Sequence, residues 1–437
     1  MRIGAKGISL PLLAVVFACS SEPGSGFDGG GGGDSGNGGS DGSVNNDSGP
    51  WMQQDSGGGG QDGGAGGGET DGTYAFDGFG KGDGNYCTDN DGDGFSNCDG
   101  DCDDNDSLVN PCAFDTDPQS GDAVGSDGKD NDCDGNVDNR RLCDGQLAAS
   151  HDTVAANYAK AIDVCDNADP RCKIVQGATW YGPQAALARR ITKHMGGYTP
   201  HKGTYMAFFS TGIADDLTDN AAYRPGDGTD LKDAFMHPAP LSAQQNVNPC
   251  GTGQNEANVP IKDYTELRLT LRAPPNAGSF TFDFNFFSME YPAYVCRGFN
   301  DTFLAMLTSK KYPNGLQIAF DPNNGRVNVN NSFFQACTGI VPADGLGYTH
   351  ACSMPLSTLN GTGYEIKYCC TGLTDGNLNK GSGATDWLKT TAPIDPGETF
   401  TLSFIVFDEG DGILDSAVNL DNFRWSSKSI GSPITAR

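Results

Sequence analysis

The sequence contains few basic residues, few histidines and no long apolar run. Lys and Arg total 28 of 437 residues against 56 Asp and Glu, which gives a net charge of −28. Such an acidic chain repels phosphate groups, so nucleic acid is excluded as a partner, whereas divalent cations are favoured. The five histidines are scattered and none stands in an H-E-x-x-H spacing. The G-x-S-x-G motif of serine hydrolases is also absent, so we predict no catalytic residues.

The N-terminal apolar segment, residues 8–17, is too short to span a membrane as a helix. Arg2 and Lys6 precede it, and residues 16–19 resemble the cleavage box of bacterial lipoproteins. We therefore predict that Cys19 is lipidated and attaches the mature chain to a membrane. Ser20 in place of an aspartate favours the outer membrane or cell surface. An ordinary secretory signal cleaved nearby is the alternative.

Cysteine numbers agree with export. There are fifteen cysteines, and removing Cys19 leaves an even number. In an oxidising compartment they predict up to seven disulfides, whose connectivity the sequence leaves open. Cys369 and Cys370 are adjacent, so we expect them to pair with different partners.

Composition divides the chain into five parts. Residues 1–19 are the signal and cleavage box, and residues 20–82 are a Gly/Asp/Ser-rich tether that is expected to be disordered because it has little apolar surface to bury. Residues 83–142 form an Asp- and Cys-rich module. Residues 143–427 are a β-rich domain with helices at its start, and residues 428–437 are a tail.

Carboxylates at alternate positions are the main feature of the module. Residues 89–94 read D-N-D-G-D-G, and oxygen ligands converging in this way suit calcium. The start matches an EF-hand loop, but Gly100 stands where the closing glutamate is expected. The predicted calcium ligands are Asp89, Asp91, Asp93, Asp99, Asp101, Asp103, Asp104, Asp106, Asp127, Asp130, Asp132, Asp134 and Asp138. An acidic linker without metal is the alternative.

This module resembles the metal-binding motif of secreted bacterial proteins, and it is similar to the aspartate loops of thrombospondin type-3 repeats. The resemblance rests on the D-x-D-G-D-G opening, the C-x-G-D-C-D-D-x-D middle and the D-x-K-D-N-D-C-D-G-x-x-D close. Residues 112–122 depart from the usual short link between the two halves, which leaves the geometry that joins them open.

The rest of the chain reads as β structure after a helical start. Alanines and apolar residues spaced by three and four within residues 142–194 predict helices, including a second short one over residues 184–194. Residues 205–210, 267–271, 280–286, 303–307, 317–320, 327–329, 400–407 and 417–425 read as strands. Many short strands with Gly and Pro turns predict a mainly β fold, an antiparallel β-sandwich that is jelly-roll-like.

The stretch from Phe280 to Phe303 organises this domain. Alternate phenylalanines at 280–286 place four rings on one face of a strand, which only a second packed layer can bury. A second metal or ligand site is predicted where this stretch meets residues 408–416. Its candidate residues are Glu290, Asn300, Asp301, Asp408, Asp411 and Asp415. The alternatives are a capped strand corner and a hairpin loop with solvated aspartates.

Motifs within about residues 155–425 resemble the choice-of-anchor L domain of bacterial surface proteins. They are the segments at 286–292, 295–296, 299–301, 329–331 and 408–421. The resemblance implies surface display rather than a reaction. The leading hypothesis is a non-catalytic, calcium-stabilised surface lipoprotein that contacts a glycan or another surface protein. The alternatives are a secreted hydrolase of extracellular polysaccharide, with Glu290 and Asp411 as paired carboxylates in the sandwich cleft, and a structural coat component.

Overall fold

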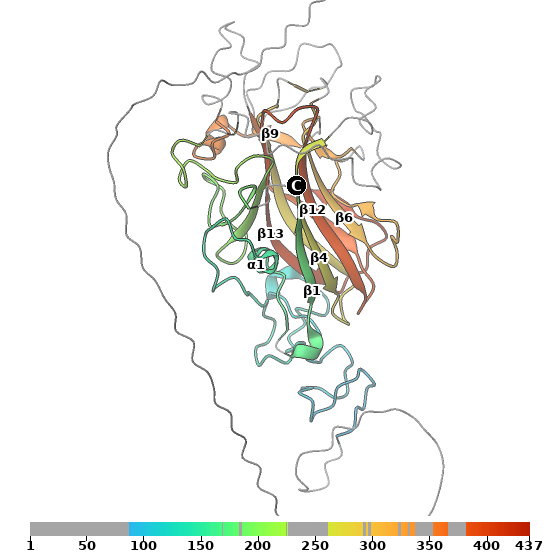
Figure 1. Ribbon diagram of the computed structural model, residues 1–437. Coiled ribbons are helices and arrows are strands. Elements are labelled where there is room, and N and C mark those ends of the chain that lie inside the picture. Colours follow the sequence, from blue (N-terminus) through green and yellow to red (C-terminus); the bar gives the residue numbers. More distant parts are fainter. Residues whose placement is uncertain are drawn as a thin grey trace, which may run out of the picture. The chain divides into compact units, whose positions relative to one another are not determined.

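A computed structural model describes residues 87–167, 169–182, 186–223, 225, 261–291, 294–295, 299–321, 325–330, 333–336, 353–365 and 382–437 (Figure 1). These residues belong to one compact unit, Tyr86–Arg437. The predicted tether, the cleavage box and Cys19 lie outside the described residues, as do Cys250, Cys296, Cys337, Cys352, Cys369 and Cys370.

Two antiparallel sheets face each other in this unit (Figure 1). The first sheet has the order β1 (Val175–Tyr181), β4 (Ile261–Arg272), β12 (Thr399–Glu409), β6 (Thr302–Thr308) and β7 (Leu316–Gln317), and β8 (Val327–Asn328) also pairs with β6. The second sheet has the order β14 (Ile434–Ala436), β11 (Leu388–Pro393), β5 (Ser279–Ser288), β13 (Ser416–Ser426), β3 (Met206–Ser210) and β2 (Arg189–Thr192). β10 (Gly383–Thr385) joins β5 to β9 (Phe334–Ala336).

Rings from β5 fill the space between the sheets. Phe280, Phe282, Phe284 and Phe286 are all fully buried. Phe282 meets Phe404 of β12 edge to face, with ring centres 5.0 Å apart, and Phe284 lies 4.8 Å from the ring of a β6 phenylalanine. Each such ring pair stabilises the fold by about 0.5–1.5 kcal/mol more than the burial of its apolar surface does alone. The predicted β-sandwich with β5 at its centre is confirmed.

The first of the two predicted N-terminal helices is confirmed, and the second, over residues 184–194, is wrong. The described part of residues 142–194 contains one α-helix, α1 (Ala155–Ala161), and one short 3-10 helix, η2 (Pro170–Cys172). The segment read as a second helix contains β2, whose residues pair with β3. Ile191 of β2 is fully buried, so pairing and burial in the sheet override its local pattern.

Most predicted strands are confirmed, with differences at the ends of the domain. Residues 317–320 contribute only the end of β7 and an isolated bridge at Phe320. The last ten residues, read as a tail, contain β14, which pairs with β11 at the edge of the second sheet. Two further 3-10 helices complete the described elements, η1 (Pro118–Ser120) and η4 (Leu356–Leu359). Among the described residues, none of the helices has the length and apolarity that crossing a membrane requires.

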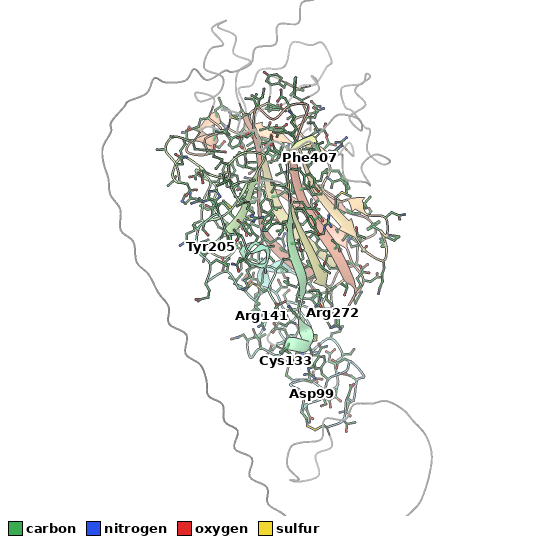
Figure 2. All side chains as sticks on the ribbon, in the orientation of Figure 1. Asp99, Cys133, Arg141, Tyr205, Arg272 and Phe407 are labelled. Atoms are coloured by element: carbon green, nitrogen blue, oxygen red, sulfur yellow. A yellow bond between two sulfur atoms is a disulfide. The ribbon has the colours of Figure 1, made fainter. Side chains whose placement is uncertain are left out.

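Disulfides rather than strands order residues 87–142, which we call the aspartate module. Within it Cys87 pairs with Cys98, and Cys102 pairs with Cys133 (Figure 2). The Cys112–Cys172 disulfide links it to the chain that follows, and Cys143–Cys165 lies directly after the module. Since the described module has one 3-10 turn and few buried apolar residues, these covalent links supply much of its order.

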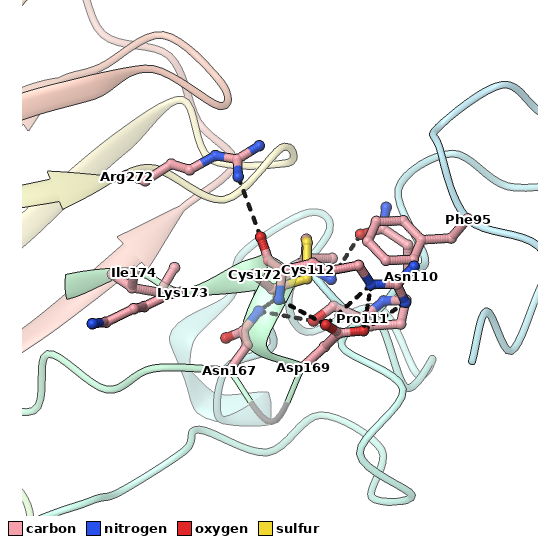
Figure 3. The surroundings of a disulfide bond; sticks show 12 residues. Phe95, Asn110, Pro111, Cys112, Asn167, Asp169, Cys172, Lys173, Ile174 and Arg272 are labelled. Carbon is pink, nitrogen blue, oxygen red and sulfur yellow. Dashed lines mark hydrogen bonds and ion pairs between the residues drawn. A yellow bond between two sulfur atoms is a disulfide. The ribbon is translucent and has the colours of Figure 1, made fainter. Parts of the chain in front are cut away.

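The module is attached to the sandwich at several points. Figure 3 shows the Cys112–Cys172 disulfide, beside which the Asn167 side chain donates to the carbonyl oxygens of Pro111 and Ala113 at 2.9 and 3.1 Å. Elsewhere the Arg140 guanidinium bonds Asp163 at 3.1 Å and also reaches Asn422 and the carbonyl oxygen of Phe423 in β13. The module and the sandwich therefore behave as parts of one structure.

Candidate metal centres

The first aspartate loop brings three predicted ligands together. Asp89, Asp91 and Asp93 each offer an oxygen, and the three oxygens lie within 4.8 Å of one another. The backbone N–H groups of Gly92 and Gly94 donate to the two oxygens of Asp89 at 2.7 and 3.0 Å. Both glycines have positive φ (81° and 97°), a conformation that other residues adopt at a cost. The D-x-D-G-D-G sequence thus folds its carboxylates inward because glycine permits the turn.

We call Asp89, Asp91 and Asp93 the first cluster, and Asp101 lies near enough for charges within the cluster to act on it. It is buried, and burial raises the pKa of Asp101, with the negative charges of Asp93 and Asp91 adding to the effect. Burial also raises the pKa of Asp93. One oxygen each of Asp91, Asp93 and Asp101 is buried without a hydrogen-bond donor among the described residues. Buried acceptor oxygens of this kind are suited to binding a cation.

The remaining acidic residues of the first loop have other partners. Asp99 accepts from Ser96 Oγ at 2.8 Å, and Asp104 accepts from both nitrogens of Asn90 at 3.1 and 2.7 Å. Lys129 bonds Asp106, which lowers the pKa of the Asp106 carboxyl, and it lies 4.0 Å from Asp103. In the described structure, these four residues stabilise the turns around the first cluster.

The second aspartate loop brings together two predicted ligands and one that the sequence analysis missed. Oxygens of Asp115, Asp130 and Asp132 lie within 4.8 Å of one another, and we call them the second cluster. Asp115 comes from residues 112–122, the link that departs from the resembling motif. Asp115 does stand in a D-x-D spacing with Asp117, but this pair has no glycine beside it and lies outside the three segments that carry the resemblance, so it was not counted among the ligands.

The other predicted ligands of the second loop support its turns. Asp127 accepts from the backbone N–H of Lys129 at 2.9 Å, and Asp138 accepts from that of Gly128 at 2.9 Å. Asp134 accepts from Asn139 at 3.1 Å and pairs with Arg141 at 3.4 Å. Hydrogen bonds from Asn139 and Asn136 and the nearby Arg141 together hold the pKa of Asp134 below its usual value despite partial burial.

The predicted second site of the sandwich is a buried carboxylate network. Glu290 follows β5, Asp301 precedes β6, and Asp408 lies in β12; each is at most 2% exposed. Burial first, and then the charge of Asp301, raise the pKa of both Glu290 and Asp408. Asp301 accepts hydrogen bonds from Glu290, Asp408 and the Ser416 hydroxyl, the last at 2.6 Å. The raised pKa values favour the protonated forms of Glu290 and Asp408, while both oxygens of Asp408 and Oε2 of Glu290 meet no donor among the described residues.

The other candidates of this site lie around the network. The Asn300 side chain accepts from Asn330, and Asp411 is half-buried and accepts from the Ile413 N–H at 3.2 Å. Asp415 is 1% exposed and lies against Gly212, where a Cβ would come within 2.1 Å of its Oδ2. The closeness of Asp415 thus explains why residue 212 is glycine. Of the carboxylate pair predicted for the hydrolase alternative, Glu290 is therefore buried and Asp411 is half-buried.

The described structure also has a small cavity between the module and the sandwich. Its walls include Asp93 and Phe95 of the module, Lys173, and Arg272 at the end of β4. The guanidinium of Arg171 lies over the Phe95 ring, 4.5 Å from its centre. Asp93 belongs both to the first cluster and to the wall of this cavity, so the first cluster lies beside the contact between the module and the sandwich.

The proton-sharing network leads to a prediction about two isosteric variants. Glu290→Gln should change the free energy of unfolding by less than about 1 kcal/mol, because the amide can donate to Asp301 as the protonated acid does. Asp301→Asn should cost about 1–3 kcal/mol, because an amide N–H would face groups that donate. Urea denaturation of both variants at neutral pH, in chelator, measures this. Equal losses in the two variants would contradict the shared-proton arrangement.

The same network determines a pH dependence. Since the folded pKa of Glu290 is raised from 4.5, its contribution to stability is complete below the unfolded pKa and is lost as the pH rises. In urea denaturation, the stability of the wild type should therefore fall relative to Glu290→Gln as the pH rises above the unfolded pKa of Glu290.

Comparison with known proteins identifies the domain. Residues 255–423 match the family model of the choice-of-anchor L domain, a range that includes β4, β5, β6 and β12 at the centre of the two sheets. No curated protein matches the chain. Among solved structures, TmCBM61 in complex with beta-1,4-galactotriose aligns at 10% identity over 60% of this chain and 90% of that chain. Its TM-score of 0.22 is too low to inform fold or ligand. The match confirms the resemblance for residues 255–423, which are similar to the choice-of-anchor L domain.

Proposed function

We propose that this protein is a non-catalytic, lipid-anchored cell-surface protein whose aspartate module binds calcium and whose sandwich binds an extracellular glycan or protein. The observation that carries the proposal is the convergence of Asp89, Asp91 and Asp93 in a disulfide-bonded module. The choice-of-anchor L domain supports the surface location.

Calcium is favoured by the chemistry of the first cluster. Its ligand atoms are carboxylate oxygens, and the nearby sulfurs of Cys87 and Cys98 are in a disulfide, so soft metals lack thiolate ligands there. The buried oxygens of Asp91 and Asp101 lack donors in the described structure. A cation would offset the cost of placing these charges together, since unpaired buried charges are strongly unfavourable.

A binding role is favoured over a hydrolytic one by the burial of the acidic network. Glycoside hydrolysis requires two carboxyl groups that flank a substrate bond. Glu290 has the raised pKa of a general acid, but it is 2% exposed, while Asp411, the other carboxylate of the predicted pair, is half-buried. The network instead links β5, β6 and β12, so its role is to hold the ends of these strands together.

Calcium should stabilise the folded protein. At a free calcium concentration one hundred times the dissociation constant, the free energy of unfolding should rise by about 2.7 kcal/mol for each site. Asp91→Asn should reduce this gain because it removes a charge from the first cluster. Thermal melts of the disulfide-intact chain in calcium and in chelator measure the effect. Asp395→Asn, an exposed carboxylate in the β11–β12 turn, is the charge-matched control. Identical melting temperatures with and without calcium would rule out the metal-binding proposal.

The lipid anchor can be tested at Cys19. The processed wild type should partition into the detergent phase, because acyl chains contribute about 0.8 kcal/mol for each buried CH₂ group. Cys19→Ala should remain in the aqueous phase or be released from cells, and Ser20→Ala should stay anchored. Detergent-phase separation of expressing cells gives the result. A Cys19→Ala variant that still partitions with detergent would argue for a different means of attachment.

A glycan array and surface cross-linking of intact cells test the proposed binding role of the sandwich. We expect saturable binding to an extracellular glycan or to a surface protein. Chain unfolded by reduction should not bind, since four of its described disulfides would be lost. A silent array leaves protein partners, and the absence of both kinds of partner would refute the binding role.

A further inference from the structure

The link between the two aspartate loops is held in place by the sandwich. Ala113, Phe114, Asp115 and Thr116 are all buried. The backbone N–H of Phe114 donates to the Asn276 side chain at 2.9 Å, and that side chain donates back to the Phe114 carbonyl oxygen at 3.0 Å. Asn276 lies in the turn between β4 and β5, and the preceding Cys112 is in a disulfide with Cys172. The position of Asp115 is therefore determined by residues of the β domain.

The oxygens of the second cluster are not all satisfied by protein donors. Asp130 accepts backbone N–H groups of Asp134 and Gly135 at 3.1 and 2.8 Å, which orients its carboxylate. Asp115 is 7% exposed, and its Oδ1 accepts from the N–H of Thr116 at 3.1 Å. Its Oδ2 is buried with no donor in the described part of the chain.

Asp132, the third member of the cluster, also has a buried oxygen that accepts no hydrogen bond among the described residues. Asp132 is 6% exposed, and its Oδ2 pairs with Arg141 at 3.2 Å. Its Oδ1 is buried without a donor among the residues described. Two nearly buried carboxylates thus each keep one vacant acceptor oxygen within a cluster whose oxygens lie within 4.8 Å of one another. The vacant oxygens are an observation independent of the acidity of the sequence.

The charges around the second cluster leave it negative. Its three carboxylates lie close to two more, since the charge of Asp138 acts on Asp115 and the charge of Asp134 acts on Asp132. Arg141 is shared with Asp134, so one guanidinium faces several carboxylates. A divalent cation would balance this charge.

Calcium fits the spacing of these atoms. It holds oxygens at about 2.3–2.6 Å, so two of its ligands can lie up to about 5 Å apart. The three oxygens of the cluster lie inside that limit. The only sulfur in the second loop, that of Cys133, is in the disulfide with Cys102 and is not a thiolate ligand. The ligand set is therefore one of oxygens alone.

We propose that Asp115, Asp130 and Asp132 bind a calcium ion that fastens the second aspartate loop to the link held by the sandwich. This inference rests on the proposed calcium-binding function and extends it by naming a site and its role. The first cluster lies within one loop, whereas the second joins two segments. Binding at the second site would thus fix the second loop against the β domain, with Asp115 as the connecting ligand.

Calorimetric titration of calcium into the full disulfide-bonded chain tests the site. The wild type should bind calcium at both clusters, and Asp115→Asn should lose one equivalent. Asp89→Asn should lose the other equivalent and leave the second site intact. Asp395→Asn is the matched control, because it makes the same change at an exposed aspartate in the β11–β12 turn, outside both clusters, and should keep both equivalents.

Melting temperatures separate a ligand role of Asp115 from a purely structural one. In calcium, Asp115→Asn should melt below the wild type. In chelator it should melt at the same temperature or above, because the variant removes a charge that is unbalanced without the ion. A lower melting temperature in both conditions, or two equivalents retained by Asp115→Asn, would overturn the proposed site. No calcium binding by the wild type would instead defeat the proposed function itself, so the two failures can be told apart.

Discussion

The constraint behind this structure is the cost of burying carboxylates. An isolated charge cannot leave water without a partner, and the chain buries acidic side chains in two separate regions. In the sandwich, burial raises the pKa of Glu290 and Asp408, which favours their protonated forms. Oxygens without a donor among the described residues occur in both regions, at Asp408 in the sandwich and at Asp101 and Asp115 in the module. The two groups of carboxylates whose oxygens converge within 4.8 Å in the described part of the chain lie in the module, so a cation suits that region.

The two regions also acquire their order by different means. The sandwich buries four rings of β5 against the opposite sheet, and area burial of about 25 cal/mol per Å² makes this the main source of its stability. The module has little apolar surface, so disulfides and ions must restrict it. Its attachment to the sandwich through Asn276 and Arg140 lets it share the stability of the β domain. The disulfide framework and the surface-protein domain are both in keeping with an extracellular location.

The spacing of residues within short segments correctly predicted the elements whose structure is determined within those segments. Alternating phenylalanines located β5, and the D-x-D-G-D-G spacing located Asp89, Asp91 and Asp93, because period-two burial and glycine turns are encoded within a few residues. The segment around β2 was misread because its partner strand, β3, determines its conformation. Asp115 was missed for the same reason. Its place beside Asp130 depends on Asn276, 162 residues from Phe114, and on a disulfide whose pairing the sequence left open.

A disulfide and the proposed calcium ion both attach the module to the sandwich. Their relative strengths decide which of these attachments calcium can control. A disulfide that closes a loop of 60 residues, as Cys112–Cys172 does, stabilises a fold by about 4 kcal/mol in the chain-entropy description. An ion at one hundred times its dissociation constant contributes about 2.7 kcal/mol. The covalent link is the stronger and does not respond to calcium, so the link segment stays against the sandwich with or without the ion. What calcium can change is the second loop, which reaches that segment through carboxylates.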